Sequence, residues 1–241
     1  MLGLAAVCLI AGSAFAQTPP PPSQPRAVTR TIYARNTELF AEWRPLVAGE
    51  ATRLTVHLTR TGERFRPYTE GTVTLTLAVE GVTVKAVADG PERAGVFRLN
   101  VTPTNAGTGR IVIDVASSAG PQRFVFDDVP VYVNVQAALA AESPEEPRLV
   151  SYPKERSWEE DFATAPVTVY FPGAGGIVTV PAIAILHDGE TTRVFVQRTP
   201  ERFELREVKT RRAIGDAIEI TSGLRAGERI VIRGADKMPR Q

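Results

Sequence analysis

The stretch Thr72-Val-Thr-Leu-Thr-Leu-Ala-Val79 decides the fold class of the first half of this 241-residue chain. Every second residue in it is large and apolar, and the residues between them are Thr or Ala. Successive side chains of a β-strand point to opposite faces, so this alternation predicts a strand with one buried face. Arg53-Leu-Thr-Val-His-Leu-Thr59 repeats the pattern. Both runs are therefore interpreted as half-buried strands of an all-β fold.

Further short apolar runs extend this pattern from about Val28 to Gln136. They lie at 82–87, 96–101, 110–115, 123–126 and 131–135. Turn-forming sequences such as Asn105-Ala-Gly107 separate them. Many short strands at this spacing are typical of an immunoglobulin-like sandwich. We therefore predict an N-terminal sandwich over residues 28–137, without the cysteine pair of true immunoglobulin domains.

The second half is predicted to be a linker followed by a small β-rich domain. Residues 138–165 contain a Pro-rich segment and a short helix near 154–162, for which Ser157 is the expected N-cap. Residues 166–236 form the small domain, with strands expected at 177–180, 182–186, 193–197, 203–210, 217–221 and 229–233. His187-Asp-Gly-Glu190 predicts a tight hairpin between two of these strands. A domain of this size buries little surface, so we expect it to pack on the sandwich.

An ordered series of motifs in the second half resembles a known family. It comprises Val-Pro-Ala at 180–182, Val-Phe-Val at 194–196, Phe203, Val208 and the run from Ile218 to Ala235. This order resembles the membrane-proximal domain of periplasmic adaptor subunits, the HlyD-like membrane fusion proteins of RND-type efflux systems. Thr37–Glu50 resembles part of the N-terminal β domain of heavy-metal efflux adaptors, and Trp158–Val167 resembles the segment by which such adaptors leave that domain for their lipoyl-like and hairpin regions. The resemblance thus covers the two ends of that architecture.

The resemblance implies a shortened, non-catalytic adaptor. A complete adaptor has lipoyl, helical-hairpin and barrel regions in its middle, whereas here the closing domain starts soon after Val167. The segment Phe171-Pro-Gly-Ala-Gly-Gly176 is the expected seam, where strands at 167–171 and 177–186 should pair. The implied partner is the inner-membrane RND pump. Contact with an outer-membrane channel is not expected without the hairpin, and a homo-oligomer stays an open alternative.

Composition indicates export and excludes nucleic acid as a partner. Residues 1–16 have the apolar core and small-residue end of a secretory signal, and residues 17–27 form a Pro-rich leader expected to be disordered. The net charge is +1, from 28 basic and 27 acidic residues spread along the chain. Arg strongly outnumbers Lys, which fits a GC-rich bacterial genome. We therefore expect the periplasm of a Gram-negative bacterium.

Residues for catalysis or metal binding are scarce. The chain has two His, His57 and His187, and its one Cys lies in the predicted signal. Neither His has the context of a catalytic triad, and no cofactor is predicted. The candidate metal ligands are His57 with Glu38 or Glu70, and Glu42 is a further carboxylate within reach. His57 is placed on the polar face of its strand, where a surface or hydrogen-bonded structural role is expected.

Two alternatives accompany these expectations. The charged run Arg202–Val208 is interpreted either as a docking edge for the pump or as an edge strand whose outward charges prevent strand addition. For the whole protein, the rivals to an adaptor are a secreted, non-catalytic binding module and a periplasmic metal-binding chaperone. The scarcity of His and Met disfavours the chaperone.

Overall fold

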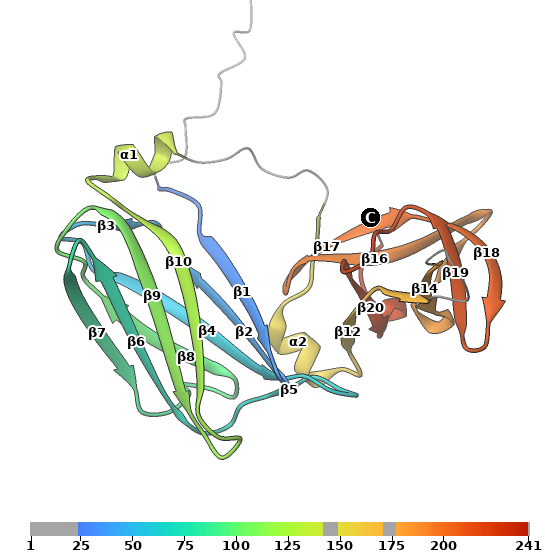
Figure 1. The fold of residues 1–241 in the computed structure, drawn as a ribbon, viewed down its shortest axis with the longest axis horizontal. Coiled ribbons are helices and arrows are strands. Elements are labelled where there is room, and N and C mark those ends of the chain that lie inside the picture. The colour runs from blue at the N-terminus through green and yellow to red at the C-terminus, as the bar shows by residue number, and fades with distance from the viewer. Residues whose placement is uncertain (1–23, 142–148, 171–176, 241) are drawn as a thin grey trace, which may run out of the picture.

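The computed structural model describes residues 24–141, 149–170 and 177–240. It confirms an all-β architecture, in which the described residues form two β regions joined by a short helical segment (Figure 1). The strands of the first region are β1 (Val28–Ala34), β2 (Thr37–Trp43), β3 (Leu46–Val47), β4 (Thr52–Arg60), β5 (Arg66–Pro67), β6 (Thr72–Val79), β7 (Val82–Ala88), β8 (Val96–Val101), β9 (Gly107–Ala116) and β10 (Gln122–Tyr132). The predicted signal and most of the Pro-rich leader lie outside the described residues.

The first region is a sandwich of two sheets. One has the order β1-β2-β4-β5 with β8 also beside β4, and the other has the order β3-β10-β9-β6-β7. Leu54, Val56 and Leu58 from β4 and Leu75 and Leu77 from β6 lie in the core between the sheets, with no exposed surface. The apolar residues of the alternating stretches at 53–59 and 72–79 therefore face the core, as predicted. The predicted sandwich is confirmed.

The last strand of the sandwich differs from expectation. The runs at 123–126 and 131–135 were predicted as two strands, but β10 is continuous from Gln122 to Tyr132. A register shift between Phe126 and Val129 in its pairing with β9 absorbs the irregular sequence between the two runs. After β10, Asn134 accepts a hydrogen bond from the backbone of Ala137 and caps helix α1 (Val135–Ala140).

The connecting segment comprises β11 (Val150–Ser151), α2 (Lys154–Glu159) and β12 (Ala163–Pro166). The helix starts at Lys154, the first residue of the predicted range, but the prediction that Ser157 caps it is wrong, because the N-cap is Pro153 and Ser157 donates to the carbonyl of Lys154. Starting there places Lys154 and Trp158, four residues apart, on the same helix face. Both side chains are buried, so packing rather than capping preference determines where the helix begins.

The second β region contains two sheets. Its further elements are β13 (Thr168–Tyr170), β14 (Ile177–Pro181), the 3-10 helix η1 (Ala182–Ala184), β15 (Leu186–Asp188), β16 (Thr191–Thr199), β17 (Arg202–Glu207), β18 (Lys209–Ile214), β19 (Ala217–Ser222), β20 (Arg229–Arg233) and the 3-10 helix η2 (Ala235–Lys237). One sheet has the order β11-β17-β16-β20-β12, with β15 beside β16, and the other has the order β13-β14-β19-β18.

Several expectations for this region are corrected or confirmed by the pairing. The strand expected at 182–186 is a 3-10 turn followed by β15, and the strand expected at 203–210 is divided at Val208 into β17 and β18. Val208 itself turns into the core between the two sheets. The hairpin expected at 187–190 is confirmed, because Asp188 pairs with Thr191 and Gly189 has the positive φ of 61° that the turn requires.

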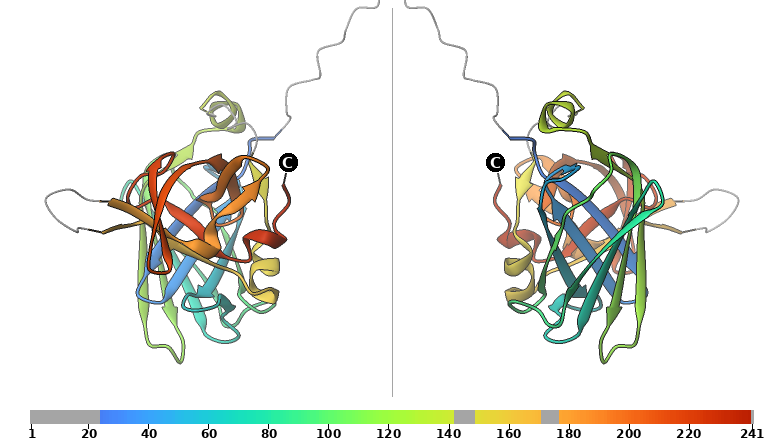
Figure 2. Two further views of the ribbon diagram at one scale, coloured as in Figure 1. Left: turned by 90° about the vertical axis from the view of Figure 1, so that its right-hand side faces the viewer. Right: turned by 90° about the vertical axis from the view of Figure 1, so that its left-hand side faces the viewer.

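The two regions pack closely on each other. Phe65 and Val96 of the sandwich belong to the same buried cluster as Trp158, Phe162 and residues of the second region. Seen along the long axis, the second region lies in front of one end of the sandwich (Figure 2). None of the described helices has the length and apolar character needed to cross a membrane.

Candidate functional site at the junction of the two regions

Strand β2 shows how the junction is built. Its side chains alternate between two faces, yet nearly every residue from Thr37 to Trp43 is buried. Leu39 and Ala41 face the sandwich core. The opposite face carries Glu38, Phe40 and Glu42, of which Glu38 and Phe40 are fully buried while the Glu42 side chain is 38% exposed. A polar face of the sandwich is thus partly buried at the junction.

A fully buried ion pair lies at the centre of this face. Nζ of Lys154 on α2 is 2.5 Å from Oε1 of Glu38 on β2, and neither side chain has any exposed surface. The ammonium also lies 4.9 Å from the centre of the Phe65 ring, within the range of a cation–π interaction. Burying two charges is costly, and their mutual attraction offsets that cost only when the geometry is favourable.

Tyr33 extends this polar contact to the second region. Its hydroxyl donates to Oε2 of Glu38 at 2.7 Å and lies 3.1 Å from Oε1 of Gln197 on β16. The guanidinium of Arg229 on β20 stacks over the Tyr33 ring at 3.9 Å. Burial, and then the charge of Glu38, raise the pKa of Tyr33 well above its usual value, so the hydroxyl keeps its proton and remains a donor.

Trp158 supplies the main apolar contact from α2. Its indole Nε1 donates to Oγ1 of Thr59 on β4 at 2.9 Å, and the ring packs against Gly95. A Cβ at residue 95 would lie 2.4 Å from the indole, and the backbone there has a φ of 78°. Only glycine therefore allows the ring to approach this part of the sandwich so closely.

His57 lies in the same buried face, next to the indole. It is on the outward side of β4, as expected, but it is only 4% exposed because Trp158 and the second region cover it. Of the two expected roles, the surface one is excluded, and the position is a buried structural one. Nε2 of His57 is 3.7 Å from Oε1 of Glu42, and the proximity of the imidazole lowers the pKa of that carboxyl. Burial raises the pKa of Glu201, which accepts a hydrogen bond from the backbone of Lys154.

The structure does not bring the three predicted metal ligands together. Glu38 is committed to Lys154 and Tyr33. Glu70 lies elsewhere, where it accepts hydrogen bonds from Ser118 and approaches Arg60. Within residues 24–141, 149–170 and 177–240, no group of three or more His, Cys, Asp and Glu side chains is arranged to hold a metal ion.

Sequence reasoning missed Lys154, Tyr33 and Gln197 at this site. A buried lysine has no local signature, since lysine is almost always exposed. Gln197 lies next to the Val-Phe-Val run of β16, but nothing in that run indicates what the amide contacts. One signal was available in β2, because Glu38 and Glu42 flank Phe40, an apolar residue on the outward face.

The charged strand, interpreted either as a docking edge or as an edge strand protected by its charges, is partly covered in its sheet. β17 pairs with β16 on one side and with β11, at Val150 and Ser151, on the other. Arg206 on β17 binds Glu204 at 2.6 Å and Glu228 at 2.8 Å. These charges therefore pair with one another, and the interpretation of β17 as an open edge is wrong at Arg202 and Phe203, which β11 covers.

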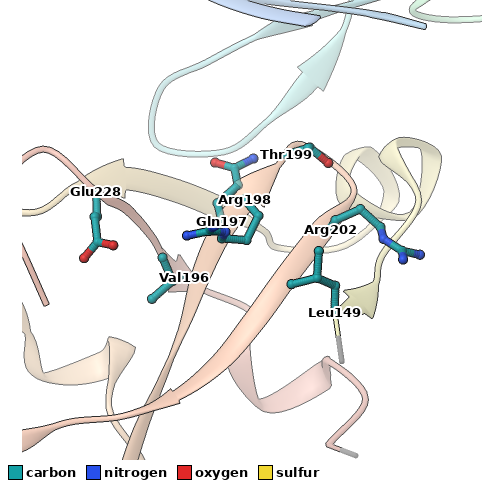
Figure 3. Close-up of a pocket in the computed structure, with 7 residues that line it drawn as sticks. All are labelled: Leu149, Val196, Gln197, Arg198, Thr199, Arg202 and Glu228. Atoms are coloured by element: carbon teal, nitrogen blue, oxygen red, sulfur yellow. The ribbon is translucent and has the colours of Figure 1, made fainter. Parts of the chain in front are cut away.

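A shallow pocket of about 340 Å³ opens beside this strand (Figure 3). Its lining residues are Leu149, Val196, Gln197, Arg198, Thr199, Arg202 and Glu228. In Figure 3 the guanidinium of Arg202 points away from that of Arg198. The polar groups do not converge on one point, so the pocket has no evident catalytic arrangement.

The other charged surface of the second region is on β18. Arg211 and Arg212 both bind the nearly buried Glu219 of β19, at 3.4 and 3.0 Å, while their own side chains stay largely exposed. β18 is an edge strand of its sheet in the part of the chain that the structure describes. It presents more positive than negative charge to solvent.

The family of the second region follows from its sequence match. Residues 178–235 match the family described as the CzcB C-terminal circularly permuted SH3-like domain. This part of the chain is similar to that family, and the match covers less than half of the chain. The matched CzcB-type domain begins within β14 and ends at η2, so it contains the β15–β16 hairpin and both Arg211 and Arg212. The predicted resemblance to heavy-metal efflux adaptors is confirmed in this domain.

Comparisons over the whole chain add little to this. No curated protein matches the sequence. Among solved structures, the crystal structure of ZneB from Cupriavidus metallidurans is similar, with 17% sequence identity and a TM-score of 0.24. The match covers 75% of this chain and 40% of the ZneB chain, so this chain spans less than half of that structure. At this TM-score the likeness supports no argument about how the sandwich and the CzcB-type domain are arranged.

Proposed function

We propose that this protein is a non-catalytic adaptor subunit of an RND-type heavy-metal efflux system, shortened in its middle, and that it acts in the periplasm by binding the inner-membrane pump. The CzcB-type domain at residues 178–235 is the observation that carries the proposal. The sandwich that precedes it agrees with the motifs of heavy-metal adaptors at Thr37–Glu50. Activity through protein contacts suits a chain whose titratable groups are used in structural pairs.

The pairing of β13 with β14 supports the internal shortening. Thr168 pairs with Thr179 and Tyr170 with Ile177 in an antiparallel ladder, as expected for strands that flank the seam. The seam residues themselves, 171–176, lie outside the described residues. In an adaptor of full length the chain leaves for the lipoyl and hairpin regions near this point and then returns. Because the two strands are direct partners, such an excursion can be removed without separating them.

The proposal predicts binding to the pump without reach to the outer membrane. A tagged version of the protein is used as bait with detergent-solubilised membranes that contain an RND heavy-metal pump and its outer-membrane channel. We expect weak capture of the pump and no capture of the channel on its own. In a strain that lacks its complete adaptor, we expect no restoration of metal resistance. Capture of the channel without the pump, or restored resistance, would contradict the proposal.

A pair of matched variants locates the binding region. Arg211→Ala/Arg212→Ala removes two positive charges from the CzcB-type domain, where the side chains are 69% and 61% exposed. Arg110→Ala/Arg123→Ala removes two ion-paired arginines of similar exposure, 62% and 69%, from the sandwich. The first variant should lower the captured amount of pump and the second should not. Equal effects would show that capture depends on net charge and not on the CzcB-type domain.

The rival functions give different results in the same experiment. A secreted binding module of unrelated use would capture no pump at all. A metal-binding chaperone would bind Zn(II), Cu(I), Co(II) or Ni(II) in calorimetry, whereas we expect no site tighter than roughly micromolar. A nanomolar site that is lost in His57→Ala would favour the chaperone.

A further inference from the structure

We propose that the buried Glu38–Lys154 pair is an orientation lock, which holds the CzcB-type domain at one angle on the sandwich and does so without adding to stability. The inference is independent of the proposed function, since it concerns how the two regions are joined. The pair lies between β2 of the sandwich and α2 of the connecting segment, and both side chains are completely buried.

The first argument is that the pair is poorly suited to stabilise the fold. Its two atoms are 2.5 Å apart, yet within the described residues neither Oε1 of Glu38 nor Nζ of Lys154 has a hydrogen bond of acceptable angle. The remaining protons of the ammonium face the Phe65 ring and not an oxygen acceptor. A buried pair recovers the cost of leaving water only when its geometry is good and its other donors are satisfied. In this pair the distance between the two charged atoms is favourable, but the hydrogen-bond angle is not, and the other donors of the ammonium are not satisfied.

The second argument is that similar defects surround the pair. Both ring nitrogens of His57, Nε2 of Gln197 and Nε of Arg229 are also buried without a hydrogen-bond partner in the described parts of the chain. All three residues lie at the junction, on β4, β16 and β20. An interface selected for stability alone would be expected to avoid such groups. The junction thus contains several buried polar side chains besides the pair, which a purely apolar interface would lack.

The third argument concerns direction. The apolar part of the junction, which includes Phe65, Val96, Trp158 and Phe162, attracts the two regions without specifying one angle. The polar contacts across the junction specify positions more narrowly: the Lys154 ammonium must lie within ion-pair distance of Glu38, the Tyr33 hydroxyl must point at Oε2 of Glu38, and Arg229 of the CzcB-type domain must lie over the Tyr33 ring. A rotation of the CzcB-type domain would break these contacts and leave Glu38 or Lys154 buried without its partner. The pair therefore penalises every angle but one.

The test replaces the pair by neutral side chains of similar volume. In Glu38→Gln/Lys154→Met, the amide oxygen of Gln still accepts from Tyr33, and Met fills the space of the lysine stem beside Phe65. Asp114→Asn/Arg123→Met, which neutralises an exposed pair of the sandwich, is the matched control. The distance between the regions is measured by pulsed electron paramagnetic resonance with spin labels at Lys85→Cys on β7 and Lys209→Cys on β18. Both sites are exposed, and Cys8, the only cysteine of the sequence, is replaced by Ser.

The unmodified pair and the control variant should each give one narrow distance peak. The neutral pair should give a second peak or a clearly broader distribution, while its urea midpoint stays equal to or above that of the parent. Lys154→Met alone should lower the midpoint, because it leaves Glu38 buried without a counter-charge. Two results would overturn the inference. One is a single unchanged peak for the neutral pair; the other is a loss of its midpoint as large as that of Lys154→Met, or failure to fold.

Discussion

Substitution of Trp158 should reveal how strongly the two regions depend on each other. The indole is 8% exposed and joins α2 to β4 through its hydrogen bond to Thr59. Trp158→Phe keeps most of the apolar contact but leaves the Thr59 hydroxyl buried without its donor, which costs about 1–3 kcal/mol. Trp158→Ala also opens a cavity against Gly95, and large-to-small changes of this kind cost about 3–5 kcal/mol.

These free energies correspond to measurable changes in melting temperature. For a chain of this length, 1 kcal/mol lowers the midpoint by about 2–4 °C, so we expect a decrease of about 2–12 °C for Trp158→Phe and about 6–20 °C for Trp158→Ala. The assay is thermal unfolding followed by circular dichroism. Thr59→Val, which keeps the shape of the side chain, completes a double-mutant cycle with Trp158→Phe. Contacting residues show coupling of about 0.5–3 kcal/mol in such cycles.

The refuting result is specific. If Trp158→Phe and Thr59→Val have additive effects, the indole hydrogen bond contributes nothing to the junction. If Trp158→Ala leaves the melting temperature unchanged, the second region does not depend on its contact with the sandwich. Either outcome would contradict the view that this small region is stabilised by packing on its neighbour.

Three further predictions concern the same face. Gly95→Ala should lower the melting temperature far more than Gly81→Ala. The two glycines have nearly the same positive φ, 78° and 77°, but only Gly95 lies against Trp158. Equal decreases in melting temperature would contradict the packing argument. Burial raises the pKa of Glu201, so its folded state holds a proton more tightly and stability falls as pH rises above the unfolded value of about 4.3. Glu201→Gln should therefore raise the urea midpoint at pH 7 and have little effect well below pH 4.3, and a lowered midpoint at pH 7 would refute this. His57 lowers the pKa of Glu42 in the folded state, so the Glu42 carboxylate stabilises the fold above the unfolded pKa of about 4.3. This stabilisation is lost as the pH falls through the lower folded pKa. Glu42→Gln should therefore lower the urea midpoint at pH 7 and leave it unchanged at pH 2–3, as urea titrations at the two pH values would check.

Local patterns were enough to predict most of the strands. In β4 and β6 the period of two identifies the inward residues, because the sandwich core accepts only the apolar face. Gly189 likewise predicts the β15–β16 hairpin, since the turn needs a residue that tolerates positive φ. The motifs between Val178 and Ala235 were also sufficient to indicate the family of the second region. Such patterns depend only on neighbouring residues in the sequence, so they can be read without knowing where the segment lies in the fold.

Where the pattern failed, distant residues decided the local structure. The helix near 154–162 is present as α2, but its expected N-cap Ser157 lies inside it and is buried, on the face that Lys154 and Trp158 pack against the sandwich. The strand expected at 203–210 is divided because Val208 turns into the core between two sheets. In both cases the free energy gained by burying a side chain exceeds the intrinsic conformational preference of the local sequence.

Alternation in the sequence of β4 assigns it one apolar and one polar face. The burial of part of the polar face, at His57, Thr59 and the neighbouring Glu38 of β2, follows only from the three-dimensional fold. Alternation reports which side chains share a face, but the cover of that face comes from residues more than a hundred positions away, such as Lys154 against Glu38 and Gln197 against Tyr33. A buried charge is acceptable only when its partner arrives from elsewhere in the fold, so neither Glu38 nor Lys154 could be recognised as buried from its own neighbours in the sequence.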